Sequence, residues 1–344
     1  MSRWAVVLAG GVGSRFWPLS TPARPKQLLP LVDDRPMLAA TLDRLAPLVP
    51  RGQTLVLTNA SLADVVRVHA RGVPNENVIP EPRAVGTGGA LAWAASEIAR
   101  RDGPDAVMLS VHADWAIGDD DGFRAALDRA ASLASTHAAL VTVGVVPSRP
   151  DVGFGYIVPG AELGDGARRV DRFVEKPDQS TAERLIAQGG LWNSGIFAWR
   201  VGDFLAEVHA HSPEIAPALT AAGANAARYF ELVTPVTVDT GVLERSSRII
   251  VIPGSFGWDD VGTWASLSRV RIPDTNGNAA SGPVVLVDAQ RNVVHAEGTD
   301  VVLYGVSDLV VVARGGLTLV TTKALSADLK ALIAQLPPEV RDRE

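Results

Sequence analysis

The segment Leu8-Ala9-Gly10-Gly11-Val12-Gly13-Ser14-Arg15-Phe16-Trp17-Pro18-Leu19 directly follows an apolar run near the N-terminus. That run, Arg3 to Ala9, has the length and composition of a buried strand. The glycines after it permit positive φ angles and let backbone N–H groups approach a phosphate closely. The loop is not a P-loop, because no Gly-Lys-Ser/Thr follows at the required spacing. It is not a dinucleotide fingerprint either, because Phe16 stands where the third glycine belongs. We therefore expect a nucleotide loop of another kind, with a tight turn that binds no ligand as the alternative.

The residues after this loop alternate between two periodicities. Apolar runs of strand length alternate with segments of helical period as far as residue 145, which is typical of a mostly parallel sheet covered by helices. The expected strands are residues 3–9, 54–58, 77–80, 105–111 and 138–145, and the expected helices are 36–48, 61–71, 87–100 and 122–136. Ligands of such open sheets bind beyond the carboxyl ends of the strands.

The pattern changes in the second half. Residues 151–199 have short strand-like runs, Gly and Pro turns and one expected helix at 181–188, and we interpret them as a lobe that closes over a second substrate. Helices are expected over 201–222 and a strand over 248–253. Residues 277–322 are β-branched runs and turns that fit a few coils of a β-helix, and residues 326–336 fit a short helix. The predicted organisation is an α/β domain over residues 1–272 and a small β-rich domain over 273–344 that ends in a helix.

Composition excludes several classes of site. The 344 residues include 32 Lys and Arg, 38 Asp and Glu and no Cys, and the net charge is −6. Without a concentrated basic face, nucleic-acid binding is not expected, and without cysteine there are no disulfides or thiolate metal sites. The sequence has no apolar run long enough to span a membrane, so we expect a cytoplasmic protein.

Lysine is rare in this chain and occurs at only four positions: Lys26, Lys176, Lys323 and Lys330. Two of these lie inside dense motifs, Pro25-Lys26-Gln27 and Glu175-Lys176-Pro177. Since an ammonium group is a compact point charge suited to a single phosphate oxygen, these two lysines are candidate phosphate ligands. Chance and a solvated surface are the alternative.

The loop and the following Arg24-Pro25-Lys26-Gln27 resemble the signature of sugar-1-phosphate nucleotidylyltransferases, and the Trp17-Pro18 and Pro25-Lys26-Gln27 details resemble their mannose-1-phosphate guanylyltransferase branch. Further matches occur in the same order along nearly the whole chain: Gly153-Phe154-Gly155-Tyr156-Ile157, Phe173-Val174-Glu175-Lys176-Pro177, Trp192-Asn193-Ser194-Gly195-Ile196-Phe197, Val238-Asp239 with Val242-Leu243-Glu244-Arg245, and Gly257-Trp258-Asp259-Asp260-Val261-Gly262-Thr263-Trp264. The resemblance implies the nucleotide-diphospho-sugar transferase fold, a Rossmann-like mixed sheet flanked by helices with a small β-helix-like C-terminal domain.

The implied reaction forms GDP-mannose and pyrophosphate from GTP and α-D-mannose 1-phosphate. In such a transfer, positioning and charge neutralisation do most of the work. By resemblance the cofactor is Mg²⁺, held by Asp114 and Asp260, and hard oxygen ligands suit this ion. Each of these aspartates has a capping role as its alternative. Asp259 competes with Asp260 for the metal role, and the family pattern of Asp, one residue, then Gly selects Asp260.

The remaining site residues also follow from the resemblance. Arg15 and Lys26, together with the two aspartates, are the expected catalytic residues. Expected nucleotide-binding residues are Leu8, Ala9, Gly10, Gly11, Gly13, Ser14, Arg15, Lys26, Glu81 and Thr87, and expected sugar-phosphate ligands are Gly155, Glu175, Lys176 and Asn193. A plain salt bridge between Glu175 and Lys176 is a weak alternative, since neighbours on a strand point to opposite faces. We expect Trp17, Trp192, Trp199, Trp258 and Trp264 to pack beneath the site.

Base recognition is the point where the sequence departs most from the family. Gly86 and the following glycines stand where relatives have an Asn-Thr-Ala pattern near the guanine. One alternative is the same chemistry with another nucleotide or hexose 1-phosphate, such as dTTP or ATP with glucose 1-phosphate. A second is a non-catalytic sugar-nucleotide sensor. A nicotinamide dehydrogenase is the third and fits least. A homodimer is possible by analogy with relatives.

Overall fold

The computed structural model describes residues 2–11 and 13–341 and has two compact units. The first unit comprises Met1–Gly10, Leu42–Ala113 and Asp119–Trp258. The second unit comprises Gly11–Thr41, Asp114–Gly118 and Asp259–Glu344. The predicted boundary between residues 272 and 273 falls inside the second unit and stays a prediction. Among the described residues, no helix has the length and apolarity needed to cross a membrane.

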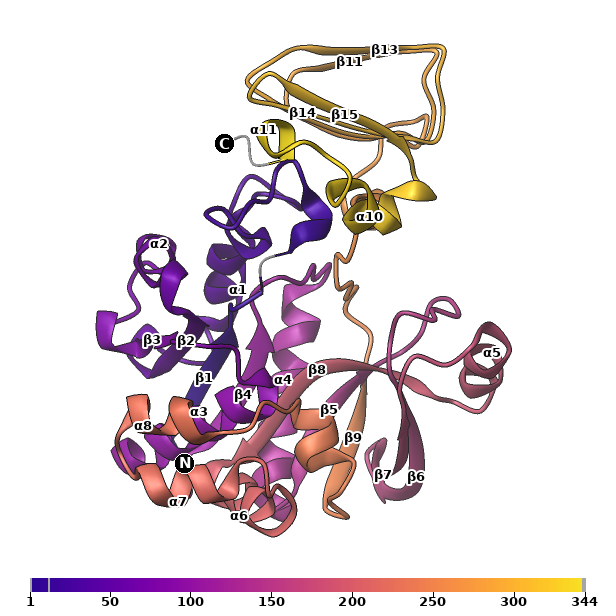
Figure 1. Cartoon of the computed structure of the whole chain (residues 1–344). Coiled ribbons are helices and arrows are strands. Elements are labelled where there is room, and N and C mark those ends of the chain that lie inside the picture. Colours follow the sequence, from indigo (N-terminus) through magenta and orange to yellow (C-terminus); the bar gives the residue numbers. More distant parts are fainter. Residues whose placement is uncertain (1, 12, 342–344) are drawn as a thin grey trace. The chain divides into compact units, whose positions relative to one another are not determined.

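The first unit is built on a nine-stranded sheet whose N-terminal part is parallel (Figure 1). Strand β1 (Arg3–Leu8) lies between β2 (Thr54–Asn59) and β4 (Val107–His112), and β3 (Val78–Glu81) pairs with the other side of β2. In the register of these strands Leu8 lies opposite His112, and Asn59 lies opposite Glu81. The carboxyl ends of the four strands therefore share one edge of the sheet, as the alternating pattern predicts.

The rest of the sheet is mixed. Strand β8 (Leu191–Arg200) runs antiparallel between β4 and β5 (Leu140–Val145), and β9 (Ile249–Gly254) is parallel to β5. Strands β7 (Ala167–Val174) and β6 (Tyr156–Gly164) complete the order beyond β9. The prediction of a separate lobe over residues 151–199 is therefore wrong for β8, which is a buried strand in the interior of the sheet. The helix predicted between the segments that form β7 and β8 is confirmed as α5 (Gln179–Ala187).

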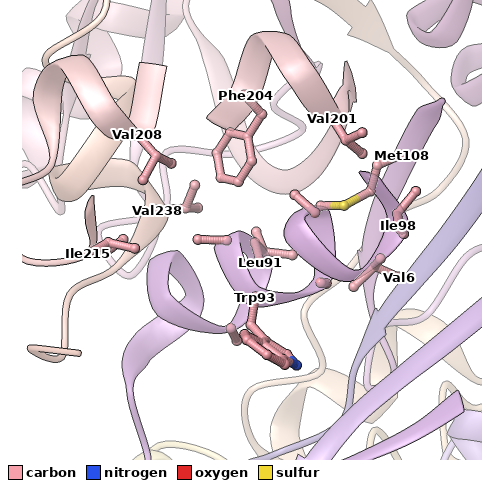
Figure 2. Packing of buried hydrophobic residues seen from close by; sticks show 14 of the residues in the cluster. Val6, Leu91, Trp93, Ile98, Met108, Val201, Phe204, Val208, Ile215 and Val238 are labelled. Atoms are coloured by element: carbon pink, nitrogen blue, oxygen red, sulfur yellow. The ribbon is translucent and has the colours of Figure 1, made fainter. Parts of the chain in front are cut away.

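Helices cover the sheet because each buries one apolar face. Leu91, Trp93 and Ile98 of α3 pack with Val6 of β1 and Met108 of β4 in one hydrophobic cluster (Figure 2). Helices α6, α7 and α8 add residues to the same cluster. The helices of this unit are α2 (Ala63–His69), α3 (Gly86–Asp102), α4 (Asp120–His137), α5, α6 (Val201–His211), α7 (Ala216–Ala222) and α8 (Ala226–Leu232), with a π-helical turn at Asp239–Leu243. Helix α1 (Met37–Leu45) connects the early segment of the second unit to the first unit.

The second unit contains the loop after β1 and the C-terminal strands. Parallel pairings join β10 (Ala279–Ser281), β12 (Val293–Glu297) and β14 (Leu309–Arg314) in one sheet, which β15 (Leu317–Thr322) completes in the antiparallel sense. A second parallel pair consists of β11 (Val284–Val287) and β13 (Val301–Tyr304), side by side in Figure 1. This stacking of successive short strands confirms the predicted β-helix-like segment. Short helices are α9 (Leu267–Val270), α10 (Leu329–Ile333) and α11 (Pro338–Arg341).

Candidate functional site

Lys26 is a buried cation in the second unit. Pro25 precedes it, and Lys26 begins a 3₁₀ turn over Lys26–Leu28. Its Nζ donates to Asp114 Oδ2 at 3.0 Å and to the backbone oxygen of Asp260 at 2.7 Å. The Lys26 side chain is 7% exposed, whereas that of Asp114 is 35% exposed. The arrangement therefore fixes an ammonium group beside a carboxylate that solvent or a ligand can still reach.

The glycine loop packs directly on the stem of Lys26. Gly13 has φ +67°, and a Cβ on it would lie 2.3 Å from Lys26 Cβ, so no larger residue fits. Two residues later, Arg15 lies in the turn Ser14–Phe16 and its Nη1 donates to the backbone oxygen of Gly262 at 3.3 Å. The structure thus brings Arg15 and Lys26 to the same short segment, residues 260–262. Gly11 is exposed, and Val12 lies outside the described residues.

Asp259 and Asp260 have different surroundings. Asp259 accepts a hydrogen bond from the Val261 N–H at 2.9 Å and a two-point contact from Arg269 at 2.7 and 3.1 Å. Its backbone forms an antiparallel bridge with Ala116, which explains why Asp114 and Asp260 both lie close to Lys26. Asp259 therefore has a structural role. The helical turn that follows is capped by Thr263 and not by Asp260, so the predicted capping alternative for Asp260 does not apply.

Asp114 and Asp260 fit a magnesium ion by the chemistry of their oxygens. Carboxylates are the hard donors that Mg²⁺ takes, usually one or two from protein, with phosphate oxygens and water completing the shell. Within the described part of the chain, no group of three or more His, Cys, Asp or Glu could hold a metal ion by itself. A metal at this position would therefore depend on substrate phosphates for its remaining ligands.

In the first unit, the carboxyl ends of β1 and β3 place Gly10 beside Glu81. A Cβ on Gly10 would lie 3.7 Å from Glu81 Oε1. Burial raises the pKa of the Glu81 carboxyl from 4.5 to about 7, and none of the hydrogen bonds among the described residues involves this carboxyl. Leu8 is the last residue of β1. The Ala9 backbone forms hydrogen bonds within the first unit: its N–H donates to the Leu57 oxygen, and its oxygen accepts from the Thr58 hydroxyl.

The glycine-rich start of α3 has a packing explanation. Gly86 has φ +74°, and a Cβ there would lie 2.3 Å from the backbone oxygen of Val236. The Gly88 N–H donates to that same oxygen at 3.0 Å. The Thr87 hydroxyl, a predicted nucleotide ligand, accepts the Val238 N–H at 2.9 Å. The departure from the family pattern here accommodates the close approach of the Val236 backbone.

Gly155, Glu175 and Asn193 lie together in the first unit. The Asn193 N–H donates to the Gly155 oxygen at 2.8 Å, and a Cβ on Gly155 would lie 2.7 Å from Glu175 Oε2. Lys176 Nζ donates to Glu175 Oε1 at 2.5 Å, with both side chains exposed. The expectation that these two neighbouring side chains point to opposite faces is wrong, because β7 ends at Val174 and Lys176 has φ +42°.

Asp239 is a further candidate to which the sequence analysis assigned no role. Its Oδ1 accepts a hydrogen bond from Asn193 Nδ2 at 2.7 Å, and burial raises the pKa of its carboxyl. It begins the π-helical turn Asp239–Leu243, and such turns are frequent at functional sites. The Val238-Asp239 match was the signal in the sequence. The five tryptophans are all buried, as packing requires, while their position beneath the site stays a prediction: Trp17, Trp192, Trp199, Trp258 and Trp264.

Comparison with known proteins agrees with these features. A sequence profile described as nucleotidyl transferase matches residues 4–276. The chain is 37% identical to the mannose-1-phosphate guanylyltransferase of Escherichia coli K12, over 98% of this chain and 74% of that protein. It is 35% identical to the xanthan biosynthesis protein XanB of Xanthomonas campestris strain B100, over 96% of this chain and 72% of that protein.

A solved structure is similar over nearly the whole chain. A Thermus thermophilus protein, described as mannose-1-phosphate geranyltransferase, superimposes with a TM-score of 0.91 and 35% identity, covering 97% of this chain and 99% of that one. The match of the profile to most of the chain, and of the relatives to nearly all of it, leads to one conclusion: the chain belongs to the nucleotidyl transferase family.

Proposed function

We propose that this nucleotidyltransferase forms GDP-mannose and pyrophosphate from GTP and α-D-mannose 1-phosphate. An oxygen of the sugar phosphate attacks the α-phosphorus of GTP, the bond from that phosphorus to the bridging oxygen breaks, and pyrophosphate leaves. The observation that supports this most is the anchored Lys26 ammonium beside Asp114 and Asp260, in a chain whose relatives include an enzyme named for this activity.

Lys26 and Arg15 are the cations for the triphosphate in this proposal. Negative charge develops on the phosphoryl oxygens as the new bond forms, and a preorganised cation stabilises it without further reorganisation. Lys26 suits the α-phosphate because two fixed acceptors already define the position of its Nζ. Arg15 is more exposed, and its guanidinium offers a planar fork for the β- and γ-phosphates.

Asp114 and Asp260 would hold Mg²⁺ in this scheme. When bound, Mg²⁺ neutralises phosphate charge and orients the triphosphate. Lys26 has a second role here, because its contact with Asp114 holds that carboxylate in place when no metal is bound. The two aspartates and the lysine thus form one interdependent set.

Glu81 supports guanine as the base. The Watson–Crick edge of guanine presents N1–H and N2–H donors side by side, and a carboxylate accepts two such hydrogen bonds. Adenine lacks this pair of donors, and uracil and thymine offer one. A desolvated carboxylate beside Gly10 therefore favours guanine through the cost of leaving its oxygens unpaired with any other base.

Glu175, Asn193 and Gly155 are the proposed sugar ligands, and Lys176 the proposed ligand of the sugar phosphate. Two carboxylates and an amide within one cluster, counting Asp239, suit a polyhydroxylated ring. The salt bridge between Lys176 and Glu175 would open when a phosphate competes for the ammonium. Its two side chains are exposed, so the cost of opening it is small.

Pyrophosphate release is the test of the proposed function. The protein is supplied with Mg²⁺ and mannose 1-phosphate, and GTP is compared with ATP, dTTP and UTP at equal concentration; glucose 1-phosphate replaces the mannose ester in a parallel series. We expect release with GTP and mannose 1-phosphate to be at least about tenfold faster than with any other pair. Preference for another pair would keep the chemistry and change the substrate, and no release from any pair would support a sensor.

A further inference from the structure

The segment that presents Lys26 and the C-terminal strands form one hydrophobic cluster within the second unit. Residues of the N-terminal segment pack with residues of β12, β14 and β15 and of helix α10. The buried members from the N-terminal segment are Phe16, Trp17, Leu19, Leu29, Leu31 and Met37, and those from the C-terminal segment include Val293, Val310, Val312, Leu319 and Leu329. The back of the Lys26 segment is therefore covered by residues far away in the sequence.

Polar contacts fix this segment on both sides of Lys26. On the C-terminal side, buried Arg271 donates from Nε to the Leu31 oxygen at 2.7 Å. On the N-terminal side, Thr21 and Arg24 close a turn on themselves through reciprocal backbone hydrogen bonds of 3.1 and 3.0 Å. Arg24 is separated from Lys26 by Pro25 alone, whose ring fixes one of the backbone angles between them.

The Arg24 side chain joins this turn to the end of strand β12. Its Nη1 donates to Glu297 Oε2 at 2.8 Å and its Nη2 donates to Glu297 Oε1 at 2.6 Å. Arg314 adds a third contact, from Nε to Glu297 Oε2 at 3.1 Å. The hydrogen bonds from Arg24 hold the pKa of the Glu297 carboxyl below its usual range. The paired geometry sets direction as well as distance, so the turn before Lys26 has little freedom to rotate.

We propose that Arg24 and Glu297 are positioning residues for Lys26. This inference rests on the proposed function, in which Lys26 meets the charge that develops at the α-phosphorus. Lys26 Nζ can neutralise that charge only if it stays between Asp114 and the Asp260 oxygen, and a displacement of about 1 Å can lower a rate by about 100-fold. Neither Arg24 nor Glu297 needs to touch a substrate.

The chain offers a matched control pair. Arg291 and Asp308 form a similar two-point contact, from Nε at 3.0 Å and from Nη2 at 2.6 Å, in the turns that precede β12 and β14. Their side chains are exposed, and among the described residues neither forms a hydrogen bond or an ion pair with the Lys26 segment. Loss of this pair removes a salt bridge of the same kind without releasing the turn at Arg24.

The first measurement is steady-state kinetics of Glu297→Gln and Arg24→Lys beside Asp308→Asn. We expect the first two variants to lower kcat by about tenfold or more, with the KM for GTP changed by less than about threefold, because binding groups remain and alignment is lost. Asp308→Asn should keep kcat within about twofold of the wild type. The double variant Arg24→Lys with Glu297→Gln should be no slower than the slower single variant, since the residues act as one pair.

The second measurement does not depend on activity. Since the chain has four lysines, labelling with an amine-acylating reagent can be assigned to each by mass spectrometry of peptides. Lys26 is buried and Lys176 is exposed, so Lys176 serves as the internal reference. We expect labelling of Lys26 relative to Lys176 to rise about threefold or more in Glu297→Gln and to stay unchanged in Asp308→Asn.

The outcomes separate the two proposals. Equal kcat and equal Lys26 labelling in Glu297→Gln and Asp308→Asn would overturn the positioning role. A wild type that transfers no nucleotide would overturn the proposed function, and the labelling comparison would then decide by itself whether Glu297 fixes Lys26. Arg24→Lys keeps the charge and loses the planar fork, so it gives the same information if Glu297→Gln fails to fold.

Discussion

Asp259 and Asp260 are adjacent carboxylates whose substitution should affect different properties: stability for Asp259 and activity for Asp260. Asp260→Asn should leave the fold intact and lower kcat by about 100-fold or more, because a proposed metal ligand loses its charge. Asp259→Asn removes the negative charge and one of the two acceptor oxygens that Arg269 contacts inside a buried site, and it should lower the free energy of unfolding by about 1–3 kcal/mol. Denaturant titration and pyrophosphate release measure the two effects. A near-normal rate for Asp260→Asn at saturating Mg²⁺ would contradict the ligand assignment.

Glu81 should make nucleotide binding depend on pH near neutrality. Its pKa is raised to about 7, so the carboxylate that we propose as the acceptor of the guanine N–H donors is lost as the pH falls below this value. We expect the KM for GTP to increase between pH 8 and pH 6 in the wild type. In Glu81→Gln the KM should be higher at pH 8 and nearly constant over this range. A constant KM in the wild type would show that Glu81 does not contact the base.

The same pKa has a consequence for the stability of the free protein. Because burial disfavours the charged form, the folded state holds this proton more tightly than the unfolded state, whose carboxyl titrates near 4.5. Relative to Glu81→Gln, the free energy of unfolding of the wild type should therefore fall as the pH rises from about 4.5 to about 7. The difference can reach about 3 kcal/mol, and chemical denaturation at pH 5 and pH 8 measures it.

Helix α3 has a glycine at each end, and the two should tolerate alanine differently. Gly86 at the start and Gly103 after the end both have positive φ, so alanine is strained at either position by roughly 1–3 kcal/mol. A Cβ at Gly86 would also overlap the Val236 oxygen, whereas nothing lies within 4 Å of one at Gly103. Gly86→Ala should therefore lower the thermal midpoint more than Gly103→Ala. Equal thermal midpoints would mean that the Val236 backbone moves away from the added Cβ without loss of stability.

At the level of elements, local pattern predicted what a segment forms but not where it lies. The apolar runs at residues 54–58 and 105–111 became β2 and β4 in parallel order because their crossovers have helical period. The place of β8 between β4 and β5 depends on backbone pairing with strands far away in the sequence, which its own residues do not encode. For the same reason the match at Val238-Asp239 did not reveal what Asp239 contacts, because its partner Asn193 lies on another element.

The candidate site follows a similar division. The family resemblance assigned roles to Arg15, Lys26, Asp114 and Asp260, and the structure brings Lys26 to Asp114 and both cations to residues 260–262, while the roles themselves stay predictions. The positioning pair was not predictable, since Arg24 and Glu297 are 273 residues apart and each alone resembles an ordinary surface charge. Only the fold of the second unit places them in contact.

Hydrophobic packing in the second unit determines whether the C-terminal strands can be an independent domain. The sequence predicts a boundary at residue 272, where strand-rich composition begins. In the structure the strands beyond this boundary share a hydrophobic cluster with the segment that presents Lys26. Buried apolar surface of this kind contributes roughly 25 cal/mol per Å², so its removal leaves the N-terminal segment without the packing that orders it.

A chain shortened to residues 1–272 tests this directly. It keeps Arg15, Lys26, Asp114 and Asp260, yet we expect kcat to fall by about 100-fold or more, because Arg24 loses Glu297 and Leu29 and Leu31 become exposed. Binding of a hydrophobic dye should increase for the same reason. Addition of residues 273–344 as a separate peptide is the control, since it should restore part of the rate and reduce dye binding. A shortened chain with the rate and the dye binding of the wild type would show that the C-terminal strands are an independent domain, and that the order around Lys26 comes from the N-terminal segment itself.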